Sequence, residues 1–354
     1  MKVLTVVGAR PNFIKMAPVS RELRKGMVEI IIHTGQHYDY ELDRIFFDQL
    51  GIPAPDHHLG IGSGSHGYQT GEMLKRIDGI LASEKPDIVL VYGDTNSTLA
   101  GALGAAKMHV PVAHVEAGLR SFDRRMPEEI NRVLTDHCSD LLFCPTETAM
   151  RQLASEGVTS GVYLTGDVGV DAIRSVADLA EDQTEVLAIN GLIRKDYSLA
   201  TVHRAENTDS YRNLSNIVDA FAEIGNVVLP VHPRTEKCLR KFNLWDQLDK
   251  SVKVIRPVGF LDMIALERNA KMILTDSGGV QKEAYVLNVP CVTLRESTEW
   301  VETVFDGWNM LVGSNRDRIV TASKSFRPGT STRNAYGDGN ARVKIRQLLE
   351  EFTA

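Results

Sequence analysis

The chain contains no long apolar run and only a few cysteines. No uninterrupted apolar stretch of its 354 residues approaches the roughly 20 that a membrane-spanning helix needs. The first apolar run breaks at Gly8 and Pro11, which makes it too short for a secretion signal. The cysteines are scattered and form no CxxC pair: Cys138, Cys144, Cys238 and Cys291. We therefore expect a cytoplasmic protein without structural zinc and without a membrane partner.

Several motifs that would define other classes of protein are also missing. Net charge is only −6, so no basic field indicates a nucleic-acid partner. The histidines show no paired metal spacing such as HExxH, and no G-x-S-x-G nucleophile elbow occurs. A G-x-G-x-x-G fingerprint is absent as well, which disfavours a nicotinamide cofactor. We expect neither a metal nor an organic cofactor.

What the sequence does contain is a regular alternation of short β-branched runs and amphipathic segments. Continuous apolar runs are typical of parallel strands covered on both faces. The runs are KVLTVV, EIIIHT, DIVLVYG and VPVAHVE in a first series, and YSLATVH, NVVLPVH, VKVIRP, KMILTD and PCVTL in a second. The amphipathic segments between them predict helices, one of them at 40–50. The polar stretch 168–195 is predicted as the junction between the two series. The fold class expected is α/β, with two Rossmann-like, doubly wound parallel-sheet domains at 1–170 and 171–335 that face a central cleft.

Polar clusters follow seven of the predicted strands, where ligands of such sheets gather. The stronger anion-binding candidate is TDSGGVQKEA, because Gly278 and Gly279 allow close approach to a phosphate at a helix start and Ser277 can cap that helix. Glu283 is placed to accept ribose hydroxyls; the alternative is an ordinary helix cap with a surface glutamate. Two cations in GARPNFIK, Arg10 and Lys15, suit a diphosphate or are solvated bases of an ordinary turn.

Four residues are candidates for acid–base chemistry, and three of them have a structural alternative. Asp94 follows an apolar run and either serves chemistry or caps the next helix. Glu116 also follows an apolar run. Glu128 stands after a proline and either serves chemistry or complements a helix dipole. His203 is either functional or a satisfied buried histidine.

With these residues assembled, the chain resembles the non-hydrolysing UDP-N-acetylglucosamine 2-epimerases over nearly its whole length. The motifs that carry the resemblance are GARPNFIK, HTGQH, YGDTNSTLAGALGAAK, HVEAGLRS, MPEEINR, FCPTE, HRAEN, HPRT, LTDSGGVQKEA and YGDG. The resemblance implies the two-domain architecture of many nucleotide-sugar glycosyltransferases, a final helix at 336–354 that returns to the first domain, and a homodimer. It also implies a UDP-sugar substrate.

The resemblance further implies roles for individual residues. Asp94, Glu116, Glu128 and His203 match positions implicated in catalysis, by anti elimination of UDP to a 2-acetamidoglucal and re-addition. The diphosphate would be held by Arg10, Lys15, Arg204, Ser277, Gly278 and Gly279. Glu283 would bind ribose, and the loop 256–260, with Phe260, would hold uracil. The remaining expected binding residues are Gln36, His37, Arg132, Glu206, His232 and Arg295.

The exact substrate is open at this point. Members of the family typically carry RDTTERPE where this chain has RESTEWVE at 295–302, a variant similar to that of the subgroup acting on UDP-2,3-diacetamido-2,3-dideoxyglucuronate. Conversion of UDP-N-acetylglucosamine to UDP-N-acetylmannosamine is favoured, with the uronate as the alternative. The sequence at 36–39 breaks the Gln-His-x-Gln pattern of a regulatory site. Two rivals come from other classes. A glycosyltransferase of the same architecture would need an acceptor groove and would release UDP with a new glycoside, whereas a nucleotide-sugar sensor would not require all four acid–base residues together.

Overall fold

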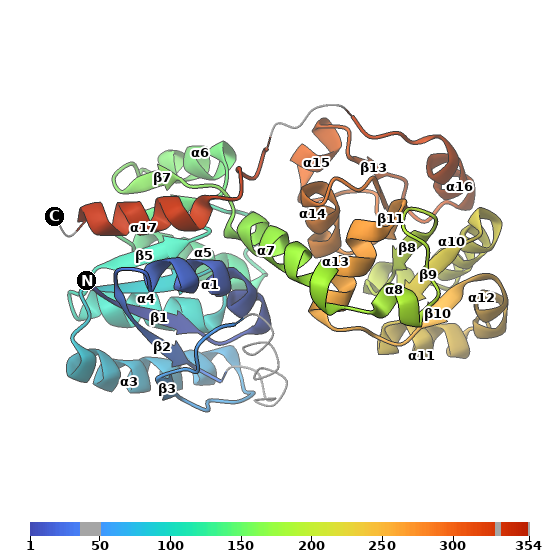
Figure 1. Cartoon of the computed structure of the whole chain (residues 1–354). Coiled ribbons are helices and arrows are strands. Elements are labelled where there is room, and N and C mark those ends of the chain that lie inside the picture. The colour runs from blue at the N-terminus through green and yellow to red at the C-terminus, as the bar shows by residue number, and fades with distance from the viewer. Residues whose placement is uncertain (36–50, 330–333, 353–354) are drawn as a thin grey trace. The chain divides into compact units, whose positions relative to one another are not determined.

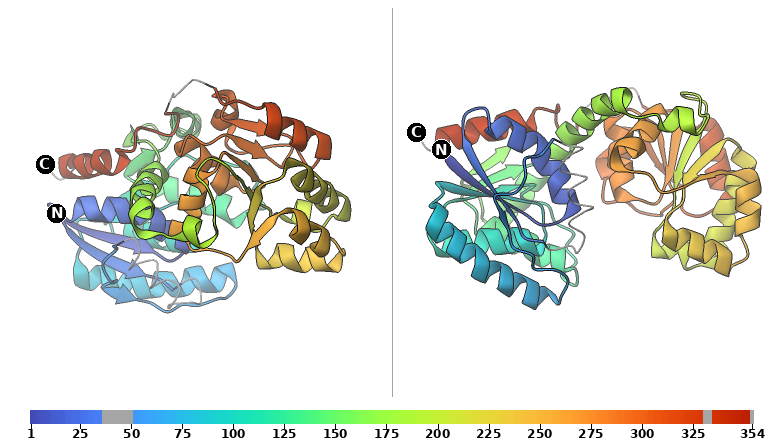
Figure 2. Two further views of the ribbon diagram at one scale, coloured as in Figure 1. Left: turned by 45° about the vertical axis from the view of Figure 1, so that its right-hand side comes forward. Right: turned by 60° about the horizontal axis from the view of Figure 1, so that its bottom comes forward.

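The computed structural model describes residues 1–35, 51–329 and 334–352, and its chain divides into two compact units. Unit 1 comprises Met1–Ala172 and Tyr336–Ala354, and unit 2 comprises Ile173–Ala335 (Figure 1). Each unit has its own sheet, and each sheet has helices on both faces (Figure 2).

The sheet of unit 1 is wholly parallel, with strand order β3-β2-β1-β4-β5-β6-β7. The order reverses between β1 and β4, which is the topological switch point where such sheets bind ligands beyond the strand carboxyl ends. The strands are β1 (Lys2–Val7), β2 (Val28–His33), β3 (His57–His58), β4 (Ile88–Tyr92), β5 (Val112–Val115), β6 (Leu141–Cys144) and β7 (Val162–Leu164).

Helices cover both faces of this sheet. All residues of its central strands β4, β5 and β6 are therefore buried. One face carries α1 packed against α17, and the other carries α3 packed against α4, with α5 beside α4 (Figure 1). The helices of the unit are α1 (Arg10–Leu23), α3 (His66–Glu84), α4 (Asn96–Lys107), α5 (Pro127–His137), α6 (Glu147–Ser155), the start of α7 (Val168–Gln183) and α17 (Ala341–Phe352).

The C-terminal helix α17 is held in unit 1 by a buried carboxylate. Asp171 on α7 accepts hydrogen bonds from the backbone amides of Ala341 and Arg342, both at 3.2 Å, and from Arg342 Nη1 at 2.8 Å. These bonds satisfy amides at the helix N-terminus that have no partner within the helix. The last segment of the chain therefore belongs to the same unit as the first.

Unit 2 repeats the strand order of unit 1 as β10-β9-β8-β11-β12-β13, again wholly parallel. Its switch point lies between β8 and β11. The strands are β8 (Ser198–Thr201), β9 (Val227–Pro230), β10 (Lys253–Ile255), β11 (Met272–Thr275), β12 (Cys291–Thr293) and β13 (Asn309–Leu311).

The main core of unit 2 lies between its sheet and α10 with α16, where Leu214, Phe221 and Ile319 are fully buried. On α10, the buried positions 214, 217, 218 and 221 recur at the spacing of one helix face. The helices are α8 (Val186–Ile189), α9 (Ala205–Thr208), α10 (Tyr211–Ile224), α11 (Pro233–Lys241), α12 (Trp245–Ser251), α13 (Phe260–Asn269), α14 (Gly278–Val286), α15 (Val301–Phe305) and α16 (Arg316–Ser325).

The two parallel-sheet α/β domains expected from the sequence are confirmed, but the strand list was incomplete. The strands β3, β6, β7 and β13 were not predicted. The stretch 168–195, interpreted as a polar junction, is helical over most of its length, in α7 and α8. A helix predicted at 40–50 lies outside the described residues.

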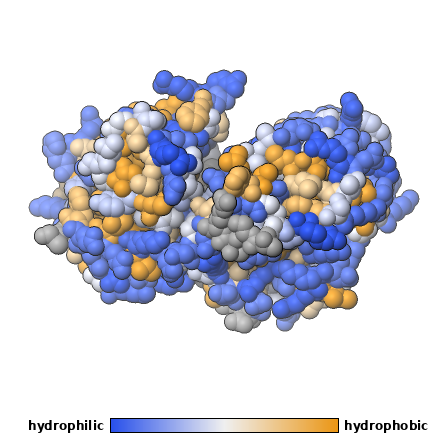
Figure 3. Space-filling model, turned by 90° about the horizontal axis from the view of Figure 1, so that it is seen from above, coloured by the Kyte–Doolittle hydropathy of each residue, from blue (hydrophilic) through white to orange (hydrophobic). Residues whose placement is uncertain are grey.

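The distribution of hydrophobic residues on the surface does not indicate where a ligand would bind. The face drawn in Figure 3 carries small apolar groups among hydrophilic residues, as is ordinary for a globular surface. No helix in the described part of the chain has the length and apolarity to cross a membrane.

Candidate functional site

At the carboxyl edge of the unit 1 sheet, Asp94 follows β4 and Glu116 follows the neighbouring strand β5. Asp94 does not cap α4: the cap is Thr95, whose hydroxyl accepts from the Thr98 amide in a capping box. The carboxylate of Asp94 is therefore available for an ion pair or for chemistry.

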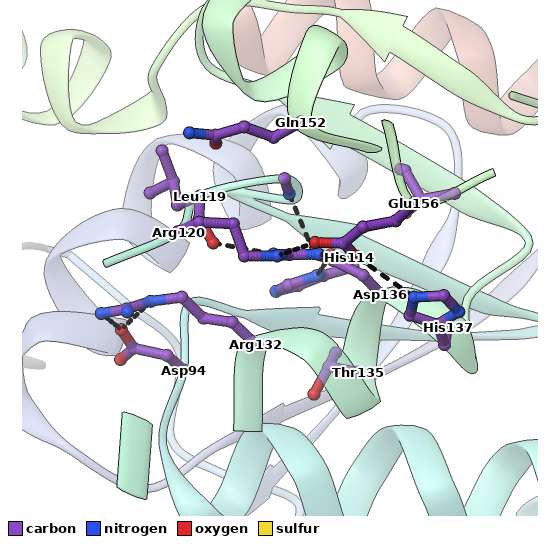
Figure 4. A network of polar contacts seen from close by, with 12 residues as sticks. Asp94, His114, Leu119, Arg120, Arg132, Thr135, Asp136, His137, Gln152 and Glu156 are labelled. Atoms are coloured by element: carbon purple, nitrogen blue, oxygen red, sulfur yellow. Dashed lines mark hydrogen bonds and ion pairs between the residues drawn. The ribbon is translucent and has the colours of Figure 1, made fainter. Parts of the chain in front are cut away.

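The partner of Asp94 is Arg132, whose Nε and Nη2 lie 2.9 and 2.7 Å from Asp94 Oδ2. Arg132 also donates from Nη1 to Glu129 Oε2 at 2.7 Å, one turn earlier on α5. The side-chain amide of Asn131 donates to the carbonyl oxygen of Asp94 at 2.9 Å. One helix thus holds both the backbone and the carboxylate of Asp94 (Figure 4).

Glu116 stands on a strained turn, because its φ of 72° is one that residues other than glycine rarely adopt. Its carboxylate forms an ion pair with Lys15 of α1, and it packs over Gly93, where an added Cβ would lie 3.3 Å from Glu116 Oε2. Strain of this kind at a strand end is frequent in functional sites. The structure thus brings Lys15 to the edge where Glu116 and Asp94 lie.

Two neighbouring glutamates at the start of α5 have different environments. Glu128 is exposed, whereas Glu129 is buried and accepts from the amides of Ser121 at 2.8 Å and Phe122 at 2.9 Å. Burial opposes ionisation of Glu129, but these amides and Arg132 together lower its pKa. Glu129 is a structural residue that the sequence reasoning missed. Its i, i+3 spacing to Arg132 was the available signal.

Three predicted residues of unit 1 cannot be placed. Gln36 and His37 lie outside the described residues. Arg10 is the first residue of α1, but its side chain is also outside the description.

In unit 2, the turn after β8 is fastened to the end of β11 by Asp276. Its fully buried carboxylate accepts from the amides of His203 and Arg204, each at 3.0 Å, and from the side chain of Asn207 at 3.0 Å. Asp276 appeared in the TDSGG motif but was assigned no role. The bonds show that it fixes the backbone on both sides of the switch point.

His203 is not the satisfied buried histidine of the alternative interpretation. The residue is partly exposed, with Nδ1 3.7 Å from Asp276 Oδ1 and its ring centroid 5.9 Å from that of His232. Burial lowers the pKa of His203, and the nearby His232 and Arg204 lower it further, whereas the Asp276 carboxylate raises it by less than these effects combined. The neutral form of the His203 imidazole is therefore favoured.

The N-terminus of α14 offers backbone amides at the switch point of unit 2. Ser277 caps it by accepting from the Val280 amide, and Gly278 and Gly279 form its first turn. The carboxylate of Glu299 lies here, since a Cβ on Gly278 would be 2.1 Å from Glu299 Oε1. Arg295 and Arg204 contact the same carboxylate at 2.9 and 3.7 Å. This cluster already holds one anionic group, as the predicted phosphate site requires.

The remaining predicted residues of unit 2 have different neighbours. His232 caps α11 by accepting from the Arg234 amide at 3.2 Å, Phe260 begins α13, and Glu206 is exposed on α9. Glu283 is only partly exposed, and its carboxyl lies close to the fully buried carboxyl of Glu267 on α13. Burial raises the pKa of both carboxyls, and the neighbouring Glu283 raises that of Glu267 further, which favours the protonated form of Glu267.

Within residues 1–35, 51–329 and 334–352, no three histidine, cysteine or acidic side chains are grouped to hold a metal ion. The site groups described above are therefore amides, guanidinium and ammonium groups, carboxylates and one histidine pair.

Comparison with known proteins identifies the family to which the chain belongs. A family profile described as UDP-N-acetylglucosamine 2-epimerase matches residues 21–350. A Methanococcus maripaludis protein named as a UDP-N-acetylglucosamine 2-epimerase homolog is 60% identical over 357 residues, covering 99% of this chain and 100% of that protein. The Pseudomonas aeruginosa UDP-2,3-diacetamido-2,3-dideoxy-D-glucuronate 2-epimerase is 49% identical, covering 99% of this chain and 100% of that enzyme.

A solved structure is similar over the same length. The Methanocaldococcus jannaschii UDP-GlcNAc 2-epimerase, crystallised with UDP-GlcNAc and UDP, has a TM-score of 0.83 and 48% identity, covering 99% of this chain and 100% of that one. Both the profile and the identities span nearly the whole sequence, so the chain belongs to the UDP-N-acetylglucosamine 2-epimerase family.

Proposed function

We propose that this chain inverts carbon 2 of a UDP-N-acetylhexosamine and converts UDP-N-acetylglucosamine to UDP-N-acetylmannosamine. The observation that carries the proposal is the pair Asp94 and Glu116, which follow adjacent parallel strands and each lie against a cation, in a chain of this family. Paired groups of this kind can take a proton from one side of a carbon and return one to the other.

The chemistry explains why such a set is needed. The hydrogen on carbon 2 is not next to a carbonyl, so a carboxylate alone cannot remove it. If UDP leaves by anti elimination, positive charge grows at carbon 1 and the neighbouring C–H becomes acidic. Return of a proton from the opposite face, followed by re-addition of UDP, gives the epimer. The enzyme must therefore stabilise a departing diphosphate and supply acid–base groups.

In this proposal each unit has its own task. Unit 1 supplies the acid–base groups Asp94, Glu116 and Glu128. Unit 2 supplies His203 and holds UDP. The diphosphate would lie at the N-terminus of α14 with Ser277, Gly278, Gly279 and Arg204, in the position that the Glu299 carboxylate takes in the free chain. Glu283 would accept the ribose hydroxyls, the 256–260 loop would contact uracil, and Arg10 and Lys15 would complete the cation set.

A second candidate substrate is UDP-2,3-diacetamido-2,3-dideoxyglucuronate. The Pseudomonas enzyme named for that substrate is as similar to this chain as the archaeal UDP-GlcNAc enzyme, at 49% against 48% identity. The local variant at 295–302 points the same way. Its Trp300 caps α15 and lies 4.8 Å from the ammonium of Lys282, a contact that the Arg-Pro pair of other members would not make.

Proton NMR of the purified protein incubated separately with the two UDP-sugars tests the proposal. We expect the anomeric signal of UDP-N-acetylmannosamine to grow from UDP-N-acetylglucosamine. Conversion of the uronate alone would show that the second candidate is the substrate. Conversion of neither would refute the epimerase proposal. Release of UDP with a new glycoside would indicate a glycosyltransferase instead.

We further propose that the chain works in the cytoplasm as a homodimer. Support for the first comes from its four cysteines, all of which are free thiols. Support for the second comes from apolar residues exposed at four-residue intervals along α5 and the loop before it: Phe122, Met126, Ile130 and Leu134. Light scattering at micromolar concentration would show twice the mass of 39.2 kDa; a monomer would contradict the second proposal.

A further inference from the structure

The turns that carry Asp94 and Glu116 rest on one buried carboxylate, that of Asp136 on α5 (Figure 4). Oδ1 of Asp136 accepts from His114 Nδ1 at 2.7 Å, and Oδ2 accepts from the amide of Gly118 at 3.1 Å. Gly118 lies two residues after Glu116. Asp136 therefore reaches the turn of Glu116 directly and has His114 as its second contact.

His114 extends the contact to the other turn. Its Nε2 lies 2.8 Å from the carbonyl oxygen of Gly93, the residue before Asp94. A carbonyl oxygen and a carboxylate both accept hydrogen bonds, so each ring nitrogen of His114 faces an acceptor. His114 and Asp136 are almost completely buried, at 0% and 1% exposure, so neither can contact a substrate.

Arg120 shares the Asp136 carboxylate with His114 and Gly118. It donates to Asp136 Oδ2 at 2.6 Å and makes two bonds of 2.7 Å to Glu156. The buried carboxylate of Asp136 thus has donors on both of its oxygens. Burial opposes ionisation of Asp136, but His114 and Arg120 together lower its pKa. The exposed His137 contacts only the outer carboxylate, with Nε2 3.2 Å from Glu156.

The turn of Glu116 needs such support because its backbone is unfavourable. Residues other than glycine rarely adopt a φ of 72°, so the surrounding contacts must hold Glu116 in this conformation. The amides of Glu116 and Ala117 both reach the Phe143 carbonyl at 3.2 Å, and the Gly118 amide goes to Asp136. Three successive amides are thus anchored, and the last anchor is the carboxylate that also orients His114.

We infer that Asp136 is a positioning residue that sets the separation of the two proposed acid–base carboxylates, acting on Glu116 through Gly118 and on Asp94 through the His114 ring and Gly93. The role rests on the proposed epimerase function. It explains why α5 matters beyond Arg132: residues 132 and 136 lie one turn apart, and each holds a different part of the same edge.

The test compares Asp136→Asn with a matched control, Glu29→Gln. An asparagine offers one acceptor oxygen to three donors, so at least one turn loses its anchor. Glu29 is also a buried carboxylate with three donors, namely Thr5 Oγ1 at 2.8 Å, Ser20 Oγ at 2.5 Å and Arg24 Nε at 2.9 Å. It lies near the amino end of β2, at the opposite edge of the sheet. Both changes replace a buried acid by its amide, so both should lower the melting temperature.

Only the change at Asp136 should affect turnover selectively. We expect Asp136→Asn to lower kcat about 10²-fold, since small displacements of reacting groups have effects of that size. KM and the Kd for UDP should stay within about threefold, and kcat of Glu29→Gln should stay within about threefold of the wild type. Equal kcat in the two variants would overturn the inference.

A measurement on the wild type keeps the inference testable if Asp136→Asn does not fold. In protein labelled with ¹⁵N-histidine, both ring nitrogens of His114 should show bound protons at pH 7.5, assigned by loss of the signals in His114→Gln. A bare His114 nitrogen in an active enzyme overturns the positioning role alone. A wild-type chain that converts neither UDP-sugar while His114 is doubly protonated overturns the proposed function.

Discussion

The two units have the same strand order, yet different groups stand at their carboxyl edges. In unit 1 the edge carries ionised side chains in pairs, Asp94 with Arg132 and Glu116 with Lys15. In unit 2 the equivalent edge carries backbone amides, a helix N-terminus and partly exposed His203, and the buried Asp276 fixes the backbone instead of facing outward. The sheet determines where a ligand can bind, and the segment that follows each strand determines what the edge can do.

This difference predicts that changes at the proposed acid–base residues of unit 1 act on turnover, and that changes at the proposed UDP contacts of unit 2 act on binding. The largest effect is expected for Asp94→Asn, which removes a proposed acid–base group while Arg132 remains. We expect kcat to fall by more than about 10²-fold with UDP still bound, measured by a coupled assay and by calorimetry.

The control, Asp87, lies at the other end of the same strand, just before β4 begins. It is exposed and accepts from the Lys2 amide at 2.6 Å, so Asp87→Asn makes the same chemical change at the opposite end. Its turnover should match the wild type. Wild-type turnover in Asp94→Asn would remove that residue from the mechanism.

Glu128 and Glu129 allow a test within one turn of α5. Glu128→Gln should lower kcat about tenfold or more and leave the melting temperature unchanged, because the side chain is exposed. Glu129→Gln should lower the melting temperature, since it weakens contacts with Arg132 and with the amides of Ser121 and Phe122. If Glu128→Gln retained full kcat, its role would be that of a helix-dipole partner only.

In unit 2 we expect Glu283→Ala to raise KM about tenfold and change kcat little, because it removes a proposed ribose contact. Glu236→Ala is a suitable control, as that exposed glutamate pairs only with Arg240 on the same helix in the part of the chain described. Steady-state kinetics with varied UDP-sugar would separate the two parameters. An unchanged KM would show that the ribose assignment is wrong.

A smaller effect concerns the buried carboxyl pair of unit 2. Burial raises the pKa of Glu267 above its unfolded value, so the folded state binds the extra proton and wild-type stability falls as pH rises between the two values. The loss is about 1.4 kcal/mol for each pH unit in that window. Glu267→Gln keeps a neutral donor beside Glu283 and should flatten the fall. Melting temperatures of both proteins from pH 5 to pH 9 would diverge if this is correct and run parallel if it is not.

Much of the fold could be predicted because its signals are local. Continuous apolar runs identify β1, β4 and β11, and the alternation with helices implies parallel sheets. The short strands β7 and β13 have three residues each and carry partly exposed side chains, so their sequences do not show the long buried run that predicts a strand. The helix α7 was not predicted, because its polar residues resemble those of a linker.

The candidate site was predictable only in part, for a different reason. Residues at strand ends such as Asp94 and Glu116 follow apolar runs, which makes a charged side chain there conspicuous. Supporting residues give a weaker signal: Asp136 and Glu129 lie inside a helix, and apart from the Glu129–Arg132 pair, the partners named above lie 7 to 22 residues away in the chain. Which acid is buried and which is exposed depends on tertiary contacts that sequence spacing does not encode.

The central claim is that carbon 2 loses and regains a proton while the bond to UDP is broken and remade. Incubation of the wild-type protein with UDP-N-acetylglucosamine in D₂O, followed by NMR of the recovered nucleotide sugars, tests it most directly. The account predicts deuterium at carbon 2 of the UDP-N-acetylmannosamine product. Product that forms with its original hydrogen at carbon 2 would contradict it.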